Sequence, residues 1–295
     1  MSTRINHNIL SMSAQRYIGQ SQNSLDSAVN KLSSGLRINS SWDDPAGLAV
    51  SERFRAQISG MVEAERNANY NINLLATAEG ALSVIDEKLI RMRSLAVQAS
   101  NGALTESDRE FLDVEFQQLK SEITRIANVT NYNTFPLIDG SLSASETMGG
   151  ELGNLTSSKA NGRSLKFHIG ANNEVNNDYY YVNLAGARAE DLGIADTDIL
   201  DTAAAQSAID MIDGAIESKD TTRTFIGALV NRLQSTITEL QVSKENAQSS
   251  ETQIRDADIA LEMANFTRAQ ILFNSGISML TQANQIPQMV AQLIG

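Results

Sequence analysis

Cysteine is absent from the 295 residues, histidine occurs twice, and proline occurs three times. Without cysteine, the chain has no disulfide framework, no thiolate metal site and no thiol nucleophile. The two histidines, His7 and His168, lie far apart in the sequence and in no zinc-ligand pattern. Because Pro45, Pro136 and Pro287 are the only prolines, long helices can run uninterrupted between them.

Patterns that mark catalytic or cofactor sites are also missing. No P-loop, GxGxxG or GxSxG motif occurs in the chain. The adjacent carboxylates Asp43 and Asp44 precede a Pro-Ala-Gly turn, and acid–base catalysis would need a pocket and a second group. A solvated or turn-capping role is therefore favoured for this pair. The sequence predicts no enzyme activity, no metal site and no cofactor.

Aromatic residues make up only 5% of the chain, although hydrophobic residues make up 42%. This composition favours helix-on-helix packing through Ala, Leu, Ile and Val over a broad globular core. The net charge of −12 argues against nucleic acid as the main partner, because no basic stripe exists to displace counterions. No apolar run is long enough to cross a membrane, and the first residues lack the apolar core of a secretory signal. We therefore expect no membrane insertion and no cleaved signal peptide.

What the chain does contain is apolar residues at heptad spacing near both ends. No charged residue occurs from Ala269 to Gly295. Spacing by alternating steps of 4 and 3 puts one apolar stripe along a helix, and such a stripe needs a partner helix. We therefore expect the two ends to pair with each other and with neighbouring molecules. The residues of this terminal seam are Ile18, Leu25, Val29, Leu32 and Leu36 near the N-terminus, and Leu272, Met279, Ala283, Ile286, Val290 and Leu293 near the C-terminus, with Gly276 in the same ladder.

Between the two ends, a heptad row from Met61 to Ala96 predicts a very long helix, and a second row from Ile212 to Ala247 predicts another. Alternating apolar residues around Phe167 and Tyr180 flank a loop of turn formers and predict one β-hairpin. The predicted fold class is mainly α, with long antiparallel helical rods, terminal coiled-coil helices and one small β-hairpin region. The expected division is residues 1–42 and 249–295 as the terminal coiled-coil domain, 43–56 as a connector, and 57–248 as a rod domain with helices 57–99, 105–128 and 201–246 and a hairpin insert at 139–198.

Two long segments resemble bacterial flagellin. The first is LSSGLRINSSWDDPAGLAVSERF (Leu32 to Phe54), followed by RNANYNINLLATAEGALSVIDEKLIRMRSLAVQASNG (Arg66 to Gly102). The second is RDADIALEMANFTRAQIL (Arg255 to Leu272), followed by SMLTQANQIPQMVAQLI (Ser278 to Ile294). Both ends match in the correct order, with the expected length of helix between them. The short middle resembles a minimal flagellin without large outer domains.

The resemblance implies a structural subunit that polymerises into the extracellular flagellar filament for motility, with the terminal seam as its polymerisation surface. It also implies export in an unfolded state, and it names as partners further copies of the chain, the hook-associated junction and cap proteins, and an export chaperone. Two alternatives stay open at this point. One is the related hook–filament junction protein, and the other is a secreted enzyme on a flagellin scaffold, against which the missing HExxH motif and the short middle count.

A second function follows from the resemblance residue by residue. In flagellins that toll-like receptor 5 recognises, an Arg, a Leu and a downstream Glu contact the receptor, and they match Arg91, Leu95 and Glu115. The alternative is that these three residues pack subunit against subunit. The alternative is favoured as the main role, because charges on long helices usually serve solvated or packing faces.

Overall fold

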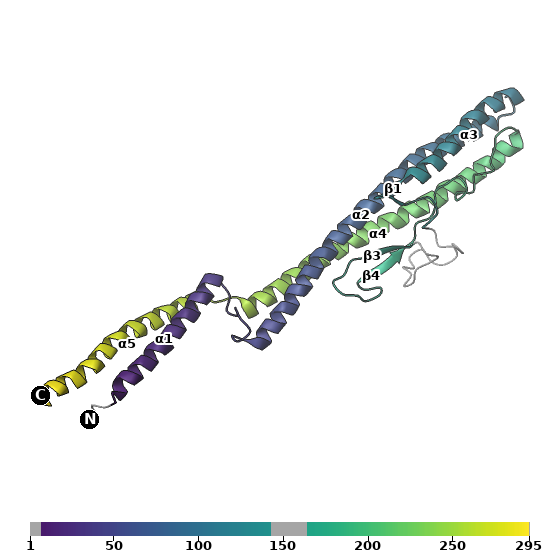
Figure 1. Cartoon of the computed structure of the whole chain (residues 1–295). Helices are drawn as coiled ribbons and strands as arrows, with labels where there is room; N and C mark the ends of the chain where they lie inside the picture. Colours follow the sequence, from purple (N-terminus) through teal and green to yellow (C-terminus); the bar gives the residue numbers. More distant parts are fainter. Residues whose placement is uncertain (1–6, 143–163, 295) are drawn as a thin grey trace. The chain divides into compact units, whose positions relative to one another are not determined.

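The computed structural model describes residues 7–142 and 164–294, and most of them are helical, which confirms the predicted mainly α fold (Figure 1). Contacts divide the chain into two compact units: unit 1 comprises Met1–Ile58 and Glu245–Gly295, and unit 2 comprises Ser59–Lys244. The helices are α1 (Ile9–Ser34), α2 (Pro45–Ala99), α3 (Glu106–Val129), α4 (Thr202–Arg255) and α5 (Ile259–Ile294). The strands are β1 (Asn131–Tyr132), β2 (Phe135–Pro136), β3 (Leu165–His168) and β4 (Tyr179–Val182).

In unit 1, α1 and α5 form an antiparallel pair. The side-chain amide of Asn8 donates to the carbonyl of Ala283 (2.8 Å) at one end, and Lys31 Nζ lies 3.5 Å from Glu262 Oε1 at the other. The Ile18 side chain packs directly on the backbone of Gly276, where a Cβ would come within 2.8 Å of Ile18 Cγ1. Small residues at the contact allow this approach, because they bring helix axes together without large side chains between them.

The start of α2 differs from the expectation. Residues 45–56 belong to α2, so the connector predicted at 43–56 ends at Asp44. Pro45 is favoured at the first helical position because its fixed φ suits a helix and its missing N–H would be unpaired there. Asp44 caps the helix: its Oδ1 accepts from the amide of Gly47 (2.9 Å), and its carbonyl accepts from Leu48 (3.0 Å). The adjacent carboxylates therefore serve the turn, as the sequence predicts.

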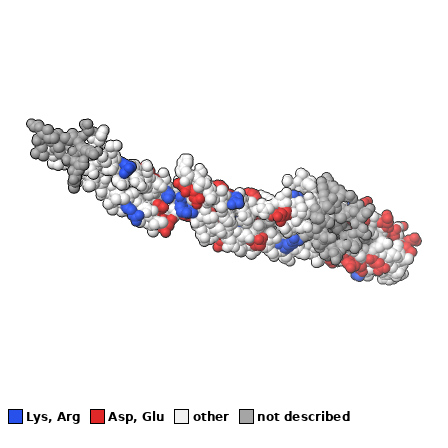
Figure 2. Space-filling model, turned by 90° about the horizontal axis from the view of Figure 1, so that it is seen from below, with Lys and Arg blue, Asp and Glu red and all other residues white. Residues whose placement is uncertain are grey.

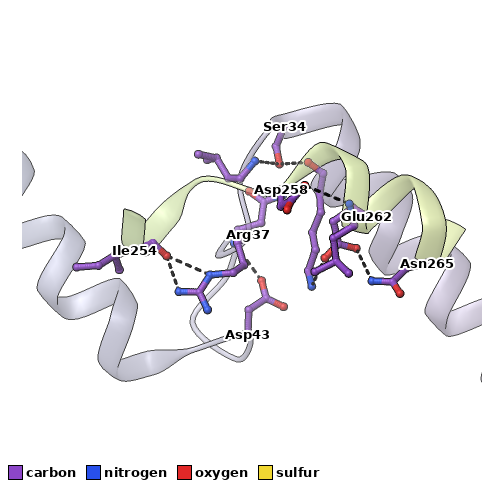
Figure 3. Close-up of polar contacts among 11 residues, drawn as sticks. Ser34, Arg37, Asp43, Ile254, Asp258, Glu262 and Asn265 are labelled. Atoms are coloured by element: carbon purple, nitrogen blue, oxygen red, sulfur yellow. Dashed lines mark hydrogen bonds and ion pairs between the residues drawn. The ribbon is translucent and has the colours of Figure 1, made fainter. Parts of the chain in front are cut away.

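In unit 1, residues 35–37, which follow α1, are joined by hydrogen bonds to residues 254–257 at the end of α4, and we call this contact the clasp (Figure 3). The amide of Arg37 donates to the carbonyl of Arg255 (2.7 Å), and the amide of Ala257 donates to the carbonyl of Gly35 (3.0 Å). Arg37 Nη2 also donates to the carbonyl of Ile254 (2.6 Å). The two bonds from Arg37 satisfy carbonyl groups in the last turn of α4 that have no partner within the helix. Gly35 has a φ of 72° and ends α1.

In unit 2, parts of α2 and α4 pack with α3 around an apolar core. Every residue of the predicted α2 row is buried: Met61, Ala68, Leu75, Leu82, Leu89 and Ala96. The members of the α4 row that lie in this unit are buried as well: Ile212, Lys219, Ile226, Leu233 and Leu240. From α3 the fully buried residues include Phe116 and Ile123. The heptad patterns therefore predict correctly which faces of the long helices meet.

Charged pairs link α2 to α4 along unit 2. Lys219 is the buried member of the set: its Nζ bonds to Asp86 Oδ1 and lies 2.7 Å from Asp220 Oδ1, and its side chain is almost completely covered. The more exposed pairs are Arg93 with Asp213 (2.6 Å), Arg223 with Glu79 (2.6 Å) and Lys244 with Glu65 (2.9 Å). In these pairs the residue number on α4 rises as that on α2 falls, so the two helices are antiparallel.

The β-structure includes the expected hairpin and one more. β3 pairs antiparallel with β4, with Phe167 opposite Tyr180, and both side chains are buried. β1 and β2 form a second, shorter hairpin, which the sequence did not predict. Its two turn residues, Asn133 and Thr134, both have positive φ, the conformation of a primed two-residue turn, but Thr is not a residue that marks such turns. Within the insert predicted at 139–198, residues 143–163 lie outside the described part of the structure.

A capping box begins α3. The Thr105 hydroxyl accepts from the amide of Asp108 (3.3 Å), and Asp108 Oδ2 accepts from the amide of Thr105 (3.0 Å). Thr105→Ala should lower the free energy of unfolding by about 1 kcal/mol, because the helix loses a cap acceptor. Urea unfolding of the purified chain would measure the change.

Thr236 offers a matched control for this substitution. Its hydroxyl donates to the carbonyl of Arg232 (3.0 Å) inside α4, a bond that contributes little to helix stability. Thr236→Ala should therefore cause no loss of stability, and the higher helix propensity of alanine should raise stability slightly. Equal losses in the two variants would show that the capping box has no stabilising effect of its own.

Candidate functional site

The predicted terminal seam divides into residues that face the partner helix and residues that face solvent. On α1, the side chains of Ile18, Leu25 and Leu32 are half-buried, as is Leu36 just beyond it, whereas Val29 is exposed. On α5, Ala283 is buried, but Leu272 and Met279 are 54% and 61% exposed, and Ile286 is also exposed. Val290 and Leu293 belong to α5, and their side chains lie outside the described part of the structure.

The face of α5 that packs on α1 is a different row from the predicted one. Its members again alternate steps of 4 and 3, and they share only Gly276 and Ala283 with the predicted ladder. Apolar residues occupy two neighbouring rows of this helix, so spacing alone could not decide which of them faces α1. The packed row is Glu262, Phe266, Ala269, Phe273, Gly276, Leu280 and Ala283.

The second row leaves α5 with an exposed apolar face, which we call the outer ladder: Leu272, Met279 and Ile286. It begins beside further exposed apolar side chains on the same helix, including Met263 and Ile271. α1 also exposes apolar residues near its start: Ile9, Leu10, Met12 and Tyr17. Exposed apolar side chains gathered on one helix in this way often mark a contact with a further partner.

Few charged residues lie on the helix pair formed by α1 and α5. Lys31 and Glu262 form the one ion pair between α1 and α5 among the residues described, and both side chains are partly covered. Acidic residues dominate elsewhere: on the face shown in Figure 2 they gather at the right-hand end, where α3 and α4 begin. Between residues 190 and 220, the only basic residue is Lys219, and it is buried.

The three residues matched to receptor contacts do not share one surface. Arg91 and Glu115 are about half exposed and form a bidentate ion pair, with Nε–Oε1 at 2.8 Å and Nη2–Oε2 at 3.0 Å. Hydrogen bonds from Arg91 lower the pKa of Glu115 below its usual range. Leu95, in contrast, is 0% exposed and belongs to the apolar core of unit 2. Arg91 and Glu115 are therefore accessible to a partner, and Leu95 supports the packing beneath them.

The turn before α2 is held by Asp43. Its Oδ2 accepts from the amides of Asn39 (3.0 Å) and Ser40 (2.8 Å) and from the Ser40 hydroxyl (2.9 Å). The bond from the Ser40 hydroxyl is the main cause that lowers the pKa of Asp43 below its ordinary value of 3.8, and the two amides add to it. A depressed pKa in the folded state means that the carboxylate stabilises the turn above pH 3.8. That stabilisation is lost as the pH falls through the folded pKa.

The effect of this turn can be tested by titration. Ser40→Ala should move the pKa of the Asp43 carboxyl back toward 3.8, because the strongest donor to the carboxylate is removed. Carboxyl chemical shifts followed by NMR from pH 6 to pH 2 would measure it (a range set by the ordinary carboxyl pKa values). Ser41→Ala is the matched control and should leave the titration unchanged, because no bond joins Ser41 to Asp43 in the described structure. Identical titrations of wild type and Ser40→Ala would contradict the assignment.

Together, the fold and the outer ladder define a helical structural protein whose paired terminal helices offer apolar faces to further partners. The sequence is similar to two flagellin family models. The model described as the bacterial flagellin N-terminal helical region matches residues 5–143, and that of the bacterial flagellin C-terminal helical region matches residues 209–294. The chain belongs to the bacterial flagellin family. This family is structural and non-enzymatic, so the chain is not an enzyme.

Relatives match over nearly the whole chain. It is 42% identical to a flagellin of Halalkalibacterium halodurans over 98% of its own length and 99% of that protein's. It is 39% identical to a flagellar filament 33 kDa core protein of Treponema phagedenis over the same shares. A structure described as that of a flagellar hook-associated protein from Vibrio parahaemolyticus has a TM-score of 0.55 at 17% identity, covering 72% of this chain and 100% of that one. At that identity the likeness concerns the fold alone. No helix in the described ranges combines the length and apolarity that crossing a membrane requires.

Proposed function

We propose that this chain is the structural subunit of a bacterial flagellar filament and that it polymerises through its paired terminal helices. The observation that carries the proposal is the outer ladder, an apolar face at heptad spacing that α1 leaves uncovered. Such a row fits a further helix, because each apolar side chain can insert between four residues of the facing helix. Family membership supports the same conclusion.

The geometry of the contact favours an open polymer. The outer ladder lies on α5, and α1 exposes different apolar residues near its start. Contacts between unlike surfaces of identical copies produce rings when the rotation closes and helical filaments when it does not. A subunit with two unlike apolar faces therefore suits growth by addition at an end. A role in motility follows from the filament.

Several finer points belong to the same proposal. The chain would be exported unfolded and without a cleaved signal peptide, and absence of cysteine suits such a route, because no disulfide can trap the chain. Its partners would be further copies of itself, the junction and cap proteins at the filament ends, and an export chaperone. Recognition by toll-like receptor 5 would use the exposed pair Arg91 and Glu115, with Leu95 fixing the helix surface from below.

The hook–filament junction protein is the second candidate, and no feature of the described structure favours it. Electron microscopy of the purified chain after addition of short flagellar seeds separates the two candidates. Long filaments growing from the seeds are expected. Seeds that stay short, with protein bound only at their ends, would instead identify a junction protein.

A further inference from the structure

Trp42 is the only tryptophan in the chain, and its side chain is 86% exposed. It lies in the turn between α1 and α2, next to Asp43. That turn is ordered, because Asp43 accepts three hydrogen bonds from Asn39 and Ser40, and Asp44 caps α2. An indole presented on an ordered turn loses little conformational entropy on binding, and tryptophan is among the residues that contribute most to interfaces.

α5 carries a depression that suits an indole. It has a volume of about 550 Å³ and is open to solvent. Arg268, which contributes to it, has no hydrogen bond or ion pair among the described residues, so its guanidinium is available to a partner. The lining is otherwise mainly apolar: Met263, Ala264, Thr267, Ile271 and Leu272.

We propose that Trp42 of one copy binds in the α5 depression of a second copy. Four contacts favour this pairing. A guanidinium attracts the face of an indole through the ring quadrupole, and a methionine sulfur makes favourable contacts with aromatic rings, so Arg268 and Met263 both suit the indole. Ile271 and Leu272 supply apolar surface. The carboxylate of Asp43, next to Trp42, complements the positive charge of Arg268.

The position of the depression on α5 indicates that the indole comes from a second copy of the chain. Leu272 belongs both to the depression and to the outer ladder, so the two surfaces are continuous on α5. The same chain does not supply the indole, because its own Trp42 is exposed. The inference rests on the proposed function, since it assigns a specific contact within the polymer.

The single tryptophan allows a direct test by fluorescence. When wild-type monomer polymerises on seeds, tryptophan emission should shift to shorter wavelength and quenching by iodide should fall, because the indole leaves water. Filaments that form with unchanged emission and quenching would overturn the contact and leave the proposed function intact. A wild-type chain that forms no filaments on seeds would overturn both.

Substitution tests the energetic role of the ring. Trp42→Ala should raise the monomer concentration needed for elongation about 30-fold, the ratio typical of losing an interface residue that dominates binding. Trp42→Phe keeps an aromatic ring and should raise this concentration less than Trp42→Ala does. Circular dichroism of the monomer serves as the folding control. The helical signal of Trp42→Ala should equal that of wild type, because the Trp42 side chain contacts little of its own chain. Equal elongation by Trp42→Ala and wild type would overturn the proposal.

Cross-linking identifies the partner surface, and the chain lacks cysteine, so there is no background. Copies carrying Ser41→Cys and copies carrying Thr267→Cys are polymerised together and treated with a short bismaleimide. Covalent heterodimers are expected from filaments. The control replaces Thr267→Cys by Ser278→Cys, which lies about 16 Å further along the same helix. Equal yields of heterodimer with Thr267→Cys and with Ser278→Cys would overturn the assignment of Trp42 to this depression. Absence of heterodimers with Thr267→Cys would overturn it as well.

Discussion

Ile286→Asp should abolish filament growth while leaving the rest of the chain helical. Ile286 is exposed in a single chain, so the substitution removes little internal packing. In the polymer, the aspartate would be buried in an apolar contact without a cation, which costs several kcal/mol. A cost of about 4 kcal/mol raises the concentration needed for growth roughly a thousandfold. Electron microscopy and sedimentation after seeding would measure the filament yield.

Asn284→Asp is the matched control for this prediction. It places the same new carboxylate two residues earlier on α5, at an exposed position outside the outer ladder. Filaments of this variant should form normally, because the charge stays in water. A normal yield from Ile286→Asp would remove the outer ladder from the proposed assembly surface. Loss of growth in both variants would show that any new charge near this end is harmful.

Phe116→Ala should produce a large loss of stability in unit 2. Phe116 is 0% exposed within the core of this unit. Truncating a buried phenylalanine removes its transfer free energy and leaves a cavity, which together cost about 3–5 kcal/mol. Chemical denaturation of the purified chain, followed by circular dichroism, would measure the change in the unfolding midpoint.

The same helix supplies the control. Phe111 is 74% exposed, only five residues before Phe116 on α3. Phe111→Ala makes the identical chemical change without opening a cavity, so stability should change by no more than about 0.5 kcal/mol. Similar losses in the two variants would contradict the placement of α3 against the core.

The sequence predicted the long helices well because their apolar rows are unambiguous. In the row from Met61 to Ala96, each buried residue is followed by another seven positions later, and the structure buries them all. α5 is different, since apolar residues fill two adjacent rows and both satisfy the same spacing. The row that packs on α1 could be identified only from the partner helix: Glu262, which pairs with Lys31, belongs to the packed row and not to the predicted ladder.

The features that the sequence did not predict depend on backbone groups and on neighbours distant in sequence. The clasp uses carbonyls and amides of residues 35–37 and 254–257, and such groups carry no sequence signal. The early start of α2 did have a signal, in Asp44 followed by Pro45, but the surrounding turn formers outweighed it. Leu95 shows another limit: a residue type matched to a family position does not reveal whether its side chain lies at the surface.

The buried cation of unit 2 has a consequence for the alignment of its long helices. Heptad rows repeat themselves, so two long helices could slide by one repeat, about 10 Å, and still bring apolar residues together. One such slip would bring Lys219 opposite Arg93, and the reverse slip would bring Arg223 opposite Ile72. Either displacement would lose cation–carboxylate pairs that now link the helices. The ion pairs between α2 and α4, taken together, therefore favour one alignment over a series of nearly equivalent ones, and Lys219 opposes the slip that would place it opposite Arg93.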